Sequence, residues 1–230
     1  MQEFGITISA FWCGWVGKKV WNLTEGPLTL GLVPEHTREV RTQNLLDGVD
    51  FAKKIHVNNI ITHAGFIPEN SCDPNYPGVL EALKKIVTKC KANDMNFLFE
   101  TGQETPVTLK RAMIDIETAL GEGNVGVNLD PANIYSYGKG NPIDAVQIFE
   151  HYIKGVHGKD GVCRTNPYQV GGHERPMGEG QVNYPLFIQK LKEVGYDGDI
   201  TIEREISGEE QRKDIVKARK LLENHHHLIP

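Results

Sequence analysis

The chain has few cysteines, no long apolar run and no excess of basic residues, and each absence excludes a class of protein. Its four cysteines, at positions 13, 72, 90 and 163, form no CxxC pair, which predicts free thiols in a reducing compartment, and we expect the cytoplasm. No apolar run approaches the roughly 20 residues that span a bilayer, and we expect no signal peptide. Lys and Arg total 25 against 30 Asp and Glu, so we expect no membrane and no nucleic-acid partner.

Strand-like and helix-like segments alternate along the chain, which predicts an α/β fold with a parallel sheet. The expected strands are residues 5–11, 59–63, 96–100, 125–130, 153–157 and 199–203. The expected helices cover residues 35–55, 78–93, 183–194 and 208–224, with two more beginning near residues 105 and 141. Residues 158–182 are expected to be irregular.

This order predicts a fold of the (β/α)₈ TIM-barrel type with six βα units, where a closed barrel has eight. We expect the first two units to be missing, either because the chain is a fragment or because the barrel is open or completed by another chain. We expect one domain over residues 1–224, followed by a tail at residues 225–230. An open sheet leaves unpaired edges, so we also expect a homo-oligomer.

Four acidic or imidazole side chains each stand at the end of an apolar strand-like run, namely Glu100, Asp130, His157 and Glu203. The carboxyl ends of parallel barrel strands converge on one rim, where active sites lie. Two Glu, one Asp and one His make an oxygen-rich site with one imidazole, which suits Mn²⁺ or Mg²⁺, with Co²⁺ or Zn²⁺ as alternatives. The sequence therefore predicts one divalent metal ion, with Mn²⁺ as the first choice.

Each of these residues has a structural explanation when it is taken alone. Glu100 can cap a helix or pair with a lysine, and Asp130 can form an Asx turn before a proline. His157 can be a hydrogen-bonded core histidine, and Glu203 can belong to a surface ion pair. All four occupy the same position in their βα units, however, and this coincidence favours one shared site.

Other polar and aromatic residues near the same rim are candidates for substrate contact. His63 ends the second expected strand, and Lys159 and Asp160 follow the metal histidine. Long loops over a barrel rim often carry specificity, and aromatic faces stack on sugars, although a Trp cluster also serves packing. The predicted substrate-binding residues are His63, Lys159, Asp160, His173, Arg175 and Trp15.

Five motifs carry a family resemblance: residues 99–104 (FETGQE), 128–133 (NLDPAN), 156–160 (VHGKD), 178–182 (GEGQV) and 195–203 (GYDGDITIE). Together they resemble the sugar phosphate isomerase/epimerase family, of the xylose-isomerase-like TIM-barrel superfamily, over about residues 5–223. The resemblance implies that the first strand here matches the third strand of the family's barrel.

The same resemblance implies a function. Glu100, Asp130, His157 and Glu203 bind one divalent metal ion, and Glu100 and Glu203 are also the catalytic acid–base pair. The expected activity is a metal-dependent isomerase or epimerase that acts on a small sugar or sugar phosphate through an enediolate. A keto-sugar or keto-inositol dehydratase and a non-catalytic sugar-binding protein are alternatives. Ketose epimerases of this superfamily carry His where this chain has Asn133, and Arg164 does not align cleanly with their arginine.

Overall fold

The computed structural model describes residues 2–169 and 173–224. Its main feature is a curled parallel sheet of six strands in the order β1-β2-β3-β4-β5-β8. These strands are β1 (Phe11–Trp12), β2 (Asn59–Thr62), β3 (Asn96–Glu100), β4 (Val125–Leu129), β5 (Ile153–Gly158) and β8 (Ile200–Ile202). The expected six βα units of the TIM-barrel type are therefore confirmed.

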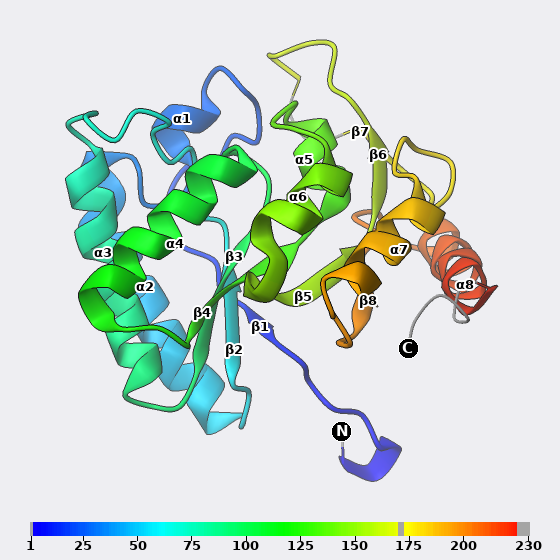
Figure 1. Cartoon of the computed structure of the whole chain (residues 1–230), viewed down its shortest axis with the longest axis horizontal. Coiled ribbons are helices and arrows are strands. Elements are labelled where there is room, and N and C mark those ends of the chain that lie inside the picture. The colour runs from blue at the N-terminus through cyan, green and yellow to red at the C-terminus, as the bar shows by residue number, and fades with distance from the viewer. Residues whose placement is uncertain (1, 170–172, 225–230) are drawn as a thin grey trace.

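The helices are α1 (Gly26–Thr29), α2 (Glu35–Lys54), α3 (Tyr76–Lys91), α4 (Pro106–Leu120), α5 (Pro131–Ser136), α6 (Pro142–Phe149), α7 (Tyr184–Glu193) and α8 (Glu209–Asn224). The outer face of the sheet is covered by α2, α3, α4, α6 and α7, which pack side by side in that order (Figure 1). Two 3₁₀ turns are η1 (Gln2–Phe4) and η2 (Glu150–Tyr152). A separate antiparallel hairpin consists of β6 (Asp160–Val162) and β7 (His173–Arg175).

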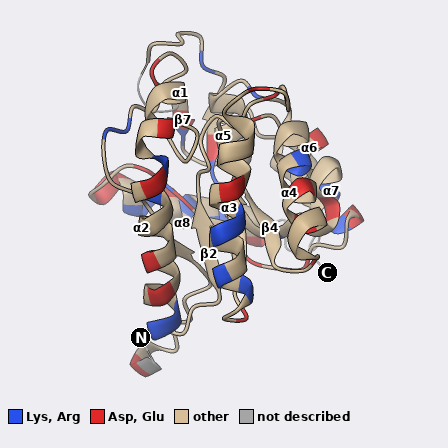
Figure 2. Ribbon diagram, turned by 90° about the vertical axis from the view of Figure 1, so that its left-hand side faces the viewer, with Lys and Arg blue, Asp and Glu red and all other residues tan. Residues whose placement is uncertain are grey.

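The core lies between the sheet and the helices because both present apolar faces there. Alternate strand residues such as Ile60, Phe97 and Phe99 point to this side and are fully buried. The opposite sides of the helices are polar, and Figure 2 shows charged residues of both signs along α2 and α3. α4 starts where Thr105 Oγ1 accepts the Thr108 N–H, directly before a proline at the first helical position.

The prediction of a first strand over residues 5–11 is wrong, because only Phe11 and Trp12 pair with β2. β2 begins at Asn59, so residues 5–9 have no neighbouring strand to pair with among the described residues. They form instead an extended arm that runs away from the body (Figure 1). The stretch 158–182, expected to be irregular, contains the β6–β7 hairpin.

β1 and β8 are the two edges of the sheet, and among the described residues their outer sides pair with no strand. A cavity of about 350 Å³ lies between them, on the inner face of the sheet. Ile61, Leu98, Asn128 and Thr201 are among its lining residues. The sheet is thus open where a closed barrel would have further strands.

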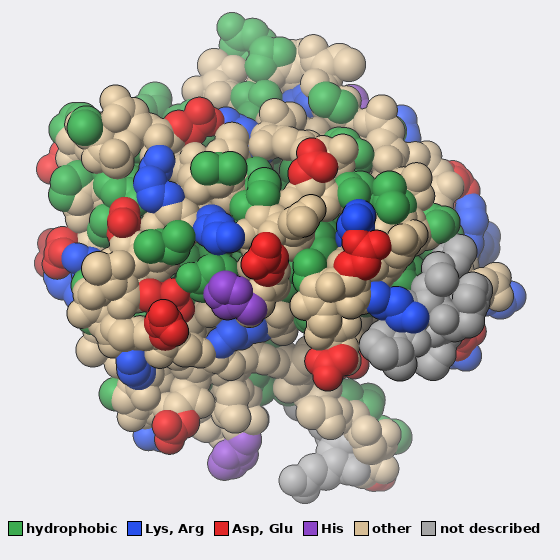
Figure 3. Space-filling model, in the orientation of Figure 1, with side chains coloured by type: hydrophobic (Ala, Val, Ile, Leu, Met, Phe, Trp, Pro, Cys, Tyr) green, Lys and Arg blue, Asp and Glu red, His purple; other side chains and the backbone are tan. Residues whose placement is uncertain are grey.

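Several surface features follow from the described residues. No described helix is long and apolar enough to cross a membrane. All four cysteines are unpaired, with Cys13 and Cys90 buried and Cys72 and Cys163 exposed. On the face shown in Figure 3, basic and acidic side chains are interspersed. The tail expected at residues 225–230 lies outside the described residues.

The loops after β1 and β2 cross at Gly31 and Gly65. This close approach predicts the effect of a substitution on stability. Gly31 has φ +66°, and a Cβ there would lie 1.9 Å from the Ala64 carbonyl oxygen. Gly31→Ala should therefore lower the free energy of unfolding by more than about 2 kcal/mol in urea titrations. Gly195 is the control: its φ is +77° but nothing lies within 4 Å of its Cβ position. Gly195→Ala should cost about 1 kcal/mol, and equal losses in the two variants would contradict the clash.

Candidate metal centre

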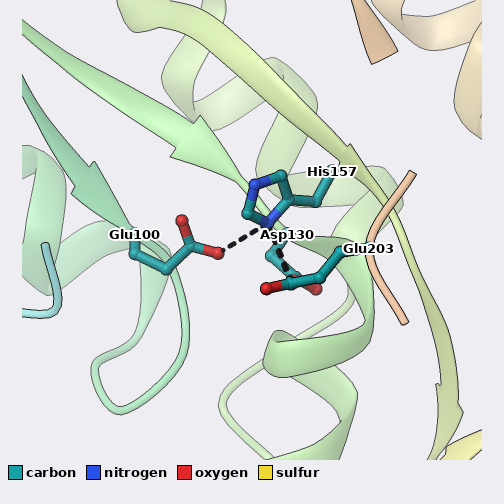
Figure 4. Close-up of side chains that lie close together, drawn as sticks. All are labelled: Glu100, Asp130, His157 and Glu203. Atoms are coloured by element: carbon teal, nitrogen blue, oxygen red, sulfur yellow. Dashed lines mark ion pairs between the residues drawn. The ribbon is translucent and has the colours of Figure 1, made fainter. Parts of the chain in front are cut away.

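Four strands bring the predicted cluster together at one rim of the sheet (Figure 4). Glu100 is the last residue of β3, Asp130 follows β4, His157 lies near the end of β5, and Glu203 follows β8. His157 Nδ1 lies 3.0 Å from Glu100 Oε1, 3.1 Å from Glu203 Oε2 and 3.5 Å from Asp130 Oδ2. One ligand atom of each residue lies within 4.8 Å of the others.

Neighbouring groups orient the two most buried carboxylates. Asn128 Nδ2 donates to Glu100 Oε2 at 2.6 Å, which turns Oε1 toward the centre of the cluster. Asp130 Oδ1 accepts the Asn133 N–H at 2.8 Å and caps α5. Its other oxygen, Oδ2, faces His157. Each carboxylate thus has one oxygen held by the protein and one directed at the cluster.

The cluster has the properties of a cation site. Glu100 Oε1, Asp130 Oδ2 and His157 Nδ1 are buried, and none of them makes a hydrogen bond within the described residues. Buried polar atoms without partners are unfavourable by about 1–3 kcal/mol each, and a bound cation would satisfy all three. Three carboxylates and one imidazole suit a divalent ion. The residues present therefore fit a divalent metal.

The environment shifts the pKa values of the cluster in opposite directions. Burial raises the pKa of Glu100. Burial also acts to raise the pKa of Glu203, but the charges of the nearby His157 and Lys159 outweigh it, so that pKa is lowered. Burial acts to lower the pKa of His157, but the charges of the surrounding carboxylates, that of Glu100 first, raise it well above its usual value.

A cavity of about 400 Å³ opens beside the cluster, within the size range of ligand sites. Two of the predicted cluster residues, Glu100 and Glu203, reach its surface. The lining consists of Trp12, Trp21, His63, Glu100, Ala132, Asn133, Ser136, Tyr137, Lys159, Glu174, Glu203 and Glu205.

Two predicted substrate residues, His63 and Lys159, line this cavity. His63 Nδ1 is buried without a hydrogen-bond partner among the described residues. Burial, followed by the charge of Lys159, lowers the pKa of His63 to about 3, so its ring is neutral at pH 7. Lys159 Nζ lies 2.7 Å from Glu205 Oε1 and 3.1 Å from Glu203 Oε2.

The other predicted substrate residues, Trp15, Asp160, His173 and Arg175, are not among the residues that line the cavity. Trp15 is buried and packs against its aromatic neighbours Trp12 and Trp21. Asp160 uses both carboxylate oxygens on backbone N–H groups, of Gly161, Gly178, Gly180 and Val182, and thereby holds the loop before α7.

His173 and Arg175 flank the one β7 residue that lines the cavity, Glu174. Successive strand side chains point to opposite sides, so His173 and Arg175 share the side away from the cavity. Residues 158–182 show no strand pattern in the sequence, so the alternation of strand side chains could not be used to predict which of them face the cavity.

Sequence reasoning also missed several lining residues. Glu205 stands two residues after Glu203, as the predicted Lys159 stands two residues after His157, a spacing that keeps such pairs on the same side of an extended chain. That signal was available for Glu205. Tyr137 follows α5, whose start is marked by Asp130 and the proline after it. Glu174 had no such signal.

The curled parallel α/β sheet and the acidic cluster at its strand ends define a protein of the TIM-barrel type with four residues that could hold a divalent cation. The family model of the xylose isomerase-like TIM barrel matches residues 1–225, and the chain belongs to this family.

Individual relatives agree with this assignment. The structure resembles a xylose isomerase domain protein from Planctomyces limnophilus, with a TM-score of 0.87 and 31% identity over 97% of this chain and 79% of that one. It also resembles a D-tagatose 3-epimerase-like protein, with a TM-score of 0.70 and 21% identity over 99% and 80% of the two chains. An uncharacterised protein of Methanocaldococcus jannaschii is 24% identical over 209 residues. That match covers 85% of this chain and 65% of the relative's length.

A second buried carboxylate lies in the loop between β3 and α4. Glu104 is 3% exposed, and neither of its oxygens has a hydrogen-bond partner among the described residues. Burial raises the pKa of Glu104 from 4.5 to about 8, against the attraction of Lys139. Glu104 is therefore protonated at neutral pH in the folded protein.

This protonation predicts a pH dependence of stability. The native state keeps the Glu104 proton up to pH about 8, whereas the unfolded chain releases it near 4.5. The Glu104 contribution to stability is thus present below pH 4.5 and is lost as pH rises to 8. The neutral amide of Glu104→Gln does not titrate, so the variant does not lose this contribution. Between pH 5 and 8 its free energy of unfolding should rise by up to about 4 kcal/mol relative to that of the wild type. Urea titrations at both pH values measure this gain.

The control is the exposed Glu122, where Glu122→Gln should leave the pH dependence of the wild type unchanged. A Glu104→Gln variant whose stability tracks wild type across the same pH range would mean that Glu104 is ionised in the folded protein.

Proposed function

We propose that this protein is a metal-dependent sugar isomerase or epimerase. The observation that carries the proposal is the meeting of Glu100 and Glu203 at one cavity, next to Asp130 and His157. The family assignment and the likeness to a D-tagatose 3-epimerase-like protein support the same reaction class. The substrate is a small carbohydrate with a carbonyl group.

In the proposed reaction the two glutamates transfer the proton. They approach the cluster from opposite sides in Figure 4. One carboxylate removes the proton from the carbon next to the carbonyl, which leaves an enediolate, and the other returns a proton to the opposite face. Glu203, whose pKa is lowered by the nearby charges of His157 and Lys159 despite burial, is ionised and suited to accept the proton.

Glu100, Asp130, His157 and Glu203 would hold one divalent ion, and we propose Mn²⁺ because most of the ligand atoms are carboxylate oxygens. When bound, the ion supplies the positive charge that stabilises the enediolate. Asn128 and the N-terminus of α5 keep the carboxylates of Glu100 and Asp130 in place for it.

The proposed acid–base pair predicts the effect of removing either carboxylate. Glu100→Gln and Glu203→Gln should each lower the rate of deuterium uptake from D₂O into the substrate by at least about 100-fold. NMR of a panel of ketoses incubated with Mn²⁺-loaded protein measures this uptake, and elemental analysis measures the metal content. Glu223→Gln, at an exposed ion pair with Arg219, is the matched control and should retain the wild-type rate.

Two outcomes would contradict the assignment. Near-native uptake in either glutamate variant with metal bound would remove that residue from the acid–base pair. Loss of water from the substrate, seen as a mass change of the product, would identify a dehydratase in place of an isomerase.

We further propose that the protein is a homo-oligomer in which a second copy covers the opening between β1 and β8. The arm before β1 exposes Phe4 and Ile6, with exposed fractions of 74% and 57%, and two unpaired strand edges lie beside the opening. An apolar extended segment and unpaired edges complement each other by strand pairing.

This proposal predicts a dimer or larger assembly in sedimentation velocity, and slow amide exchange in β8. Ile6→Asp should shift the protein toward monomer, because a charge would then be buried in the interface. Val107→Asp is the control, since Val107 is 65% exposed on α4 in the outer helix layer. A wild-type monomer at micromolar concentration would refute the proposal.

A further inference from the structure

The cavity beside the metal cluster has a marked charge imbalance. Four glutamates reach its surface, Glu100, Glu174, Glu203 and Glu205, against one ammonium group, that of Lys159. Asp130 adds a fifth carboxylate directly behind them. A divalent ion held by Glu100, Asp130 and Glu203 would not offset all of their charge. A substrate therefore meets a surface with no surplus of positive charge.

The Lys159 ammonium group is fully occupied by the protein. The side chain is 4% exposed, and Nζ lies 2.7 Å from Glu205 Oε1, 3.1 Å from Glu203 Oε2 and 3.6 Å from Asp130 Oδ2. It also lies 3.4 Å from Asn133 Oδ1. An ammonium group has three protons to donate. An anionic substrate group would have to displace a carboxylate to reach it.

The guanidinium groups nearest the cavity are engaged as well. Arg204 lies between Glu174 Oε2, at 2.6 Å, and Asp214 Oδ2, at 2.8 Å. Arg164 packs over the Tyr137 ring and donates to the carbonyl oxygens of residues 21 and 169. Arg175 lies on the side of β7 away from the cavity, because its neighbour Glu174 lines it.

The opposite wall of the cavity is uncharged. Trp12 and Trp21 pack around His63, with ring centroids 6.1 and 5.2 Å from the imidazole. His63 is buried among these rings, and its Nδ1 has no hydrogen-bond partner within the described part of the chain. Indole faces suit the C–H faces of a sugar, and the carboxylates opposite suit its hydroxyl groups.

We propose that this cavity selects an uncharged, unphosphorylated ketose and rejects sugar phosphates, and that Glu205 is the residue that sets this preference. Glu205 neutralises the Lys159 ammonium, the one lining cation, and also places its own carboxylate at the cavity. A phosphate ester would face Glu205 and Glu174 without a cation to compensate. The inference rests on the proposed function for its substrate class, but it concerns binding and can be measured without turnover.

Intrinsic tryptophan fluorescence gives a direct binding readout, because Trp12 and Trp21 line the cavity. The probes are D-fructose, D-psicose and D-tagatose, each compared with its 6-phosphate, with Mn²⁺-loaded protein at constant ionic strength. For the wild type, the tightest neutral ketose should bind at least about tenfold more tightly than its phosphate.

A substitution in the cavity tests the role of Glu205. Glu205→Gln releases Lys159 and removes one carboxylate, so it should raise the affinity for the sugar phosphate about tenfold. Adding Lys159→Gln to that variant should abolish the gain. Glu223→Gln removes an equal charge at a surface ion pair and should leave both affinities at wild-type values.

Several results would overturn the inference. The inference is wrong if sugar phosphates bind the wild type as tightly as neutral ketoses do. It is also wrong if no neutral ketose of the panel binds. Unchanged phosphate affinity in Glu205→Gln would remove Glu205 as the determinant. Failure of the proposed function gives a different pattern, in which neutral ketoses bind but take up no deuterium. Deuterium uptake into phosphates alone would preserve the function and exclude this substrate class.

Discussion

The concentration of negative charge at the strand ends is the constraint on which the rest of the structure depends. Glu100, Asp130 and Glu203 offer oxygens within 4.8 Å of one another. At an effective dielectric constant of about 20, each such pair of charges repels by about 3 kcal/mol. Lys159 and the imidazole of His157 offset part of this repulsion, and a cation would offset the remainder. The apolar layer between sheet and helices holds the strands in register against it.

The two glutamates differ in how firmly they are held. Glu100 ends a central strand and is almost fully buried, with one oxygen fixed by Asn128. Glu203 follows the short edge strand β8, has a side chain that is 33% exposed, and depends on contacts from the hairpin side. The Glu205 N–H donates to Glu174, and Arg204 pairs with the same carboxylate. One of the two proposed acid–base groups is therefore held on both sides, while the other follows the position of a loop.

The sequence alone predicted the six βα units and the four cluster residues, because both depend on local patterns. Buried strands end in a polar residue, and helices begin at signals such as Thr105 before its proline. The first strand was placed wrongly because pairing at an edge depends on where β2 begins, at Asn59. Glu174 could not be found because β7 exists only through antiparallel pairing with β6. Trp12 and Trp21 line the cavity, whereas the predicted Trp15 packs against both of them, a difference that depends on tertiary packing.

The crossing of Gly31 and Gly65 leaves no room between the loops after β1 and β2, so the tryptophan side of the cavity is locked by backbone contact. On the other side, the hairpin and the segment after β8 are joined mainly through side chains, among them Glu174 and Arg204. Side chains can be exchanged one at a time, whereas an interlocked backbone cannot. Substitutions on the hairpin side can therefore reshape that wall one side chain at a time, while the loops that carry the tryptophans keep their path.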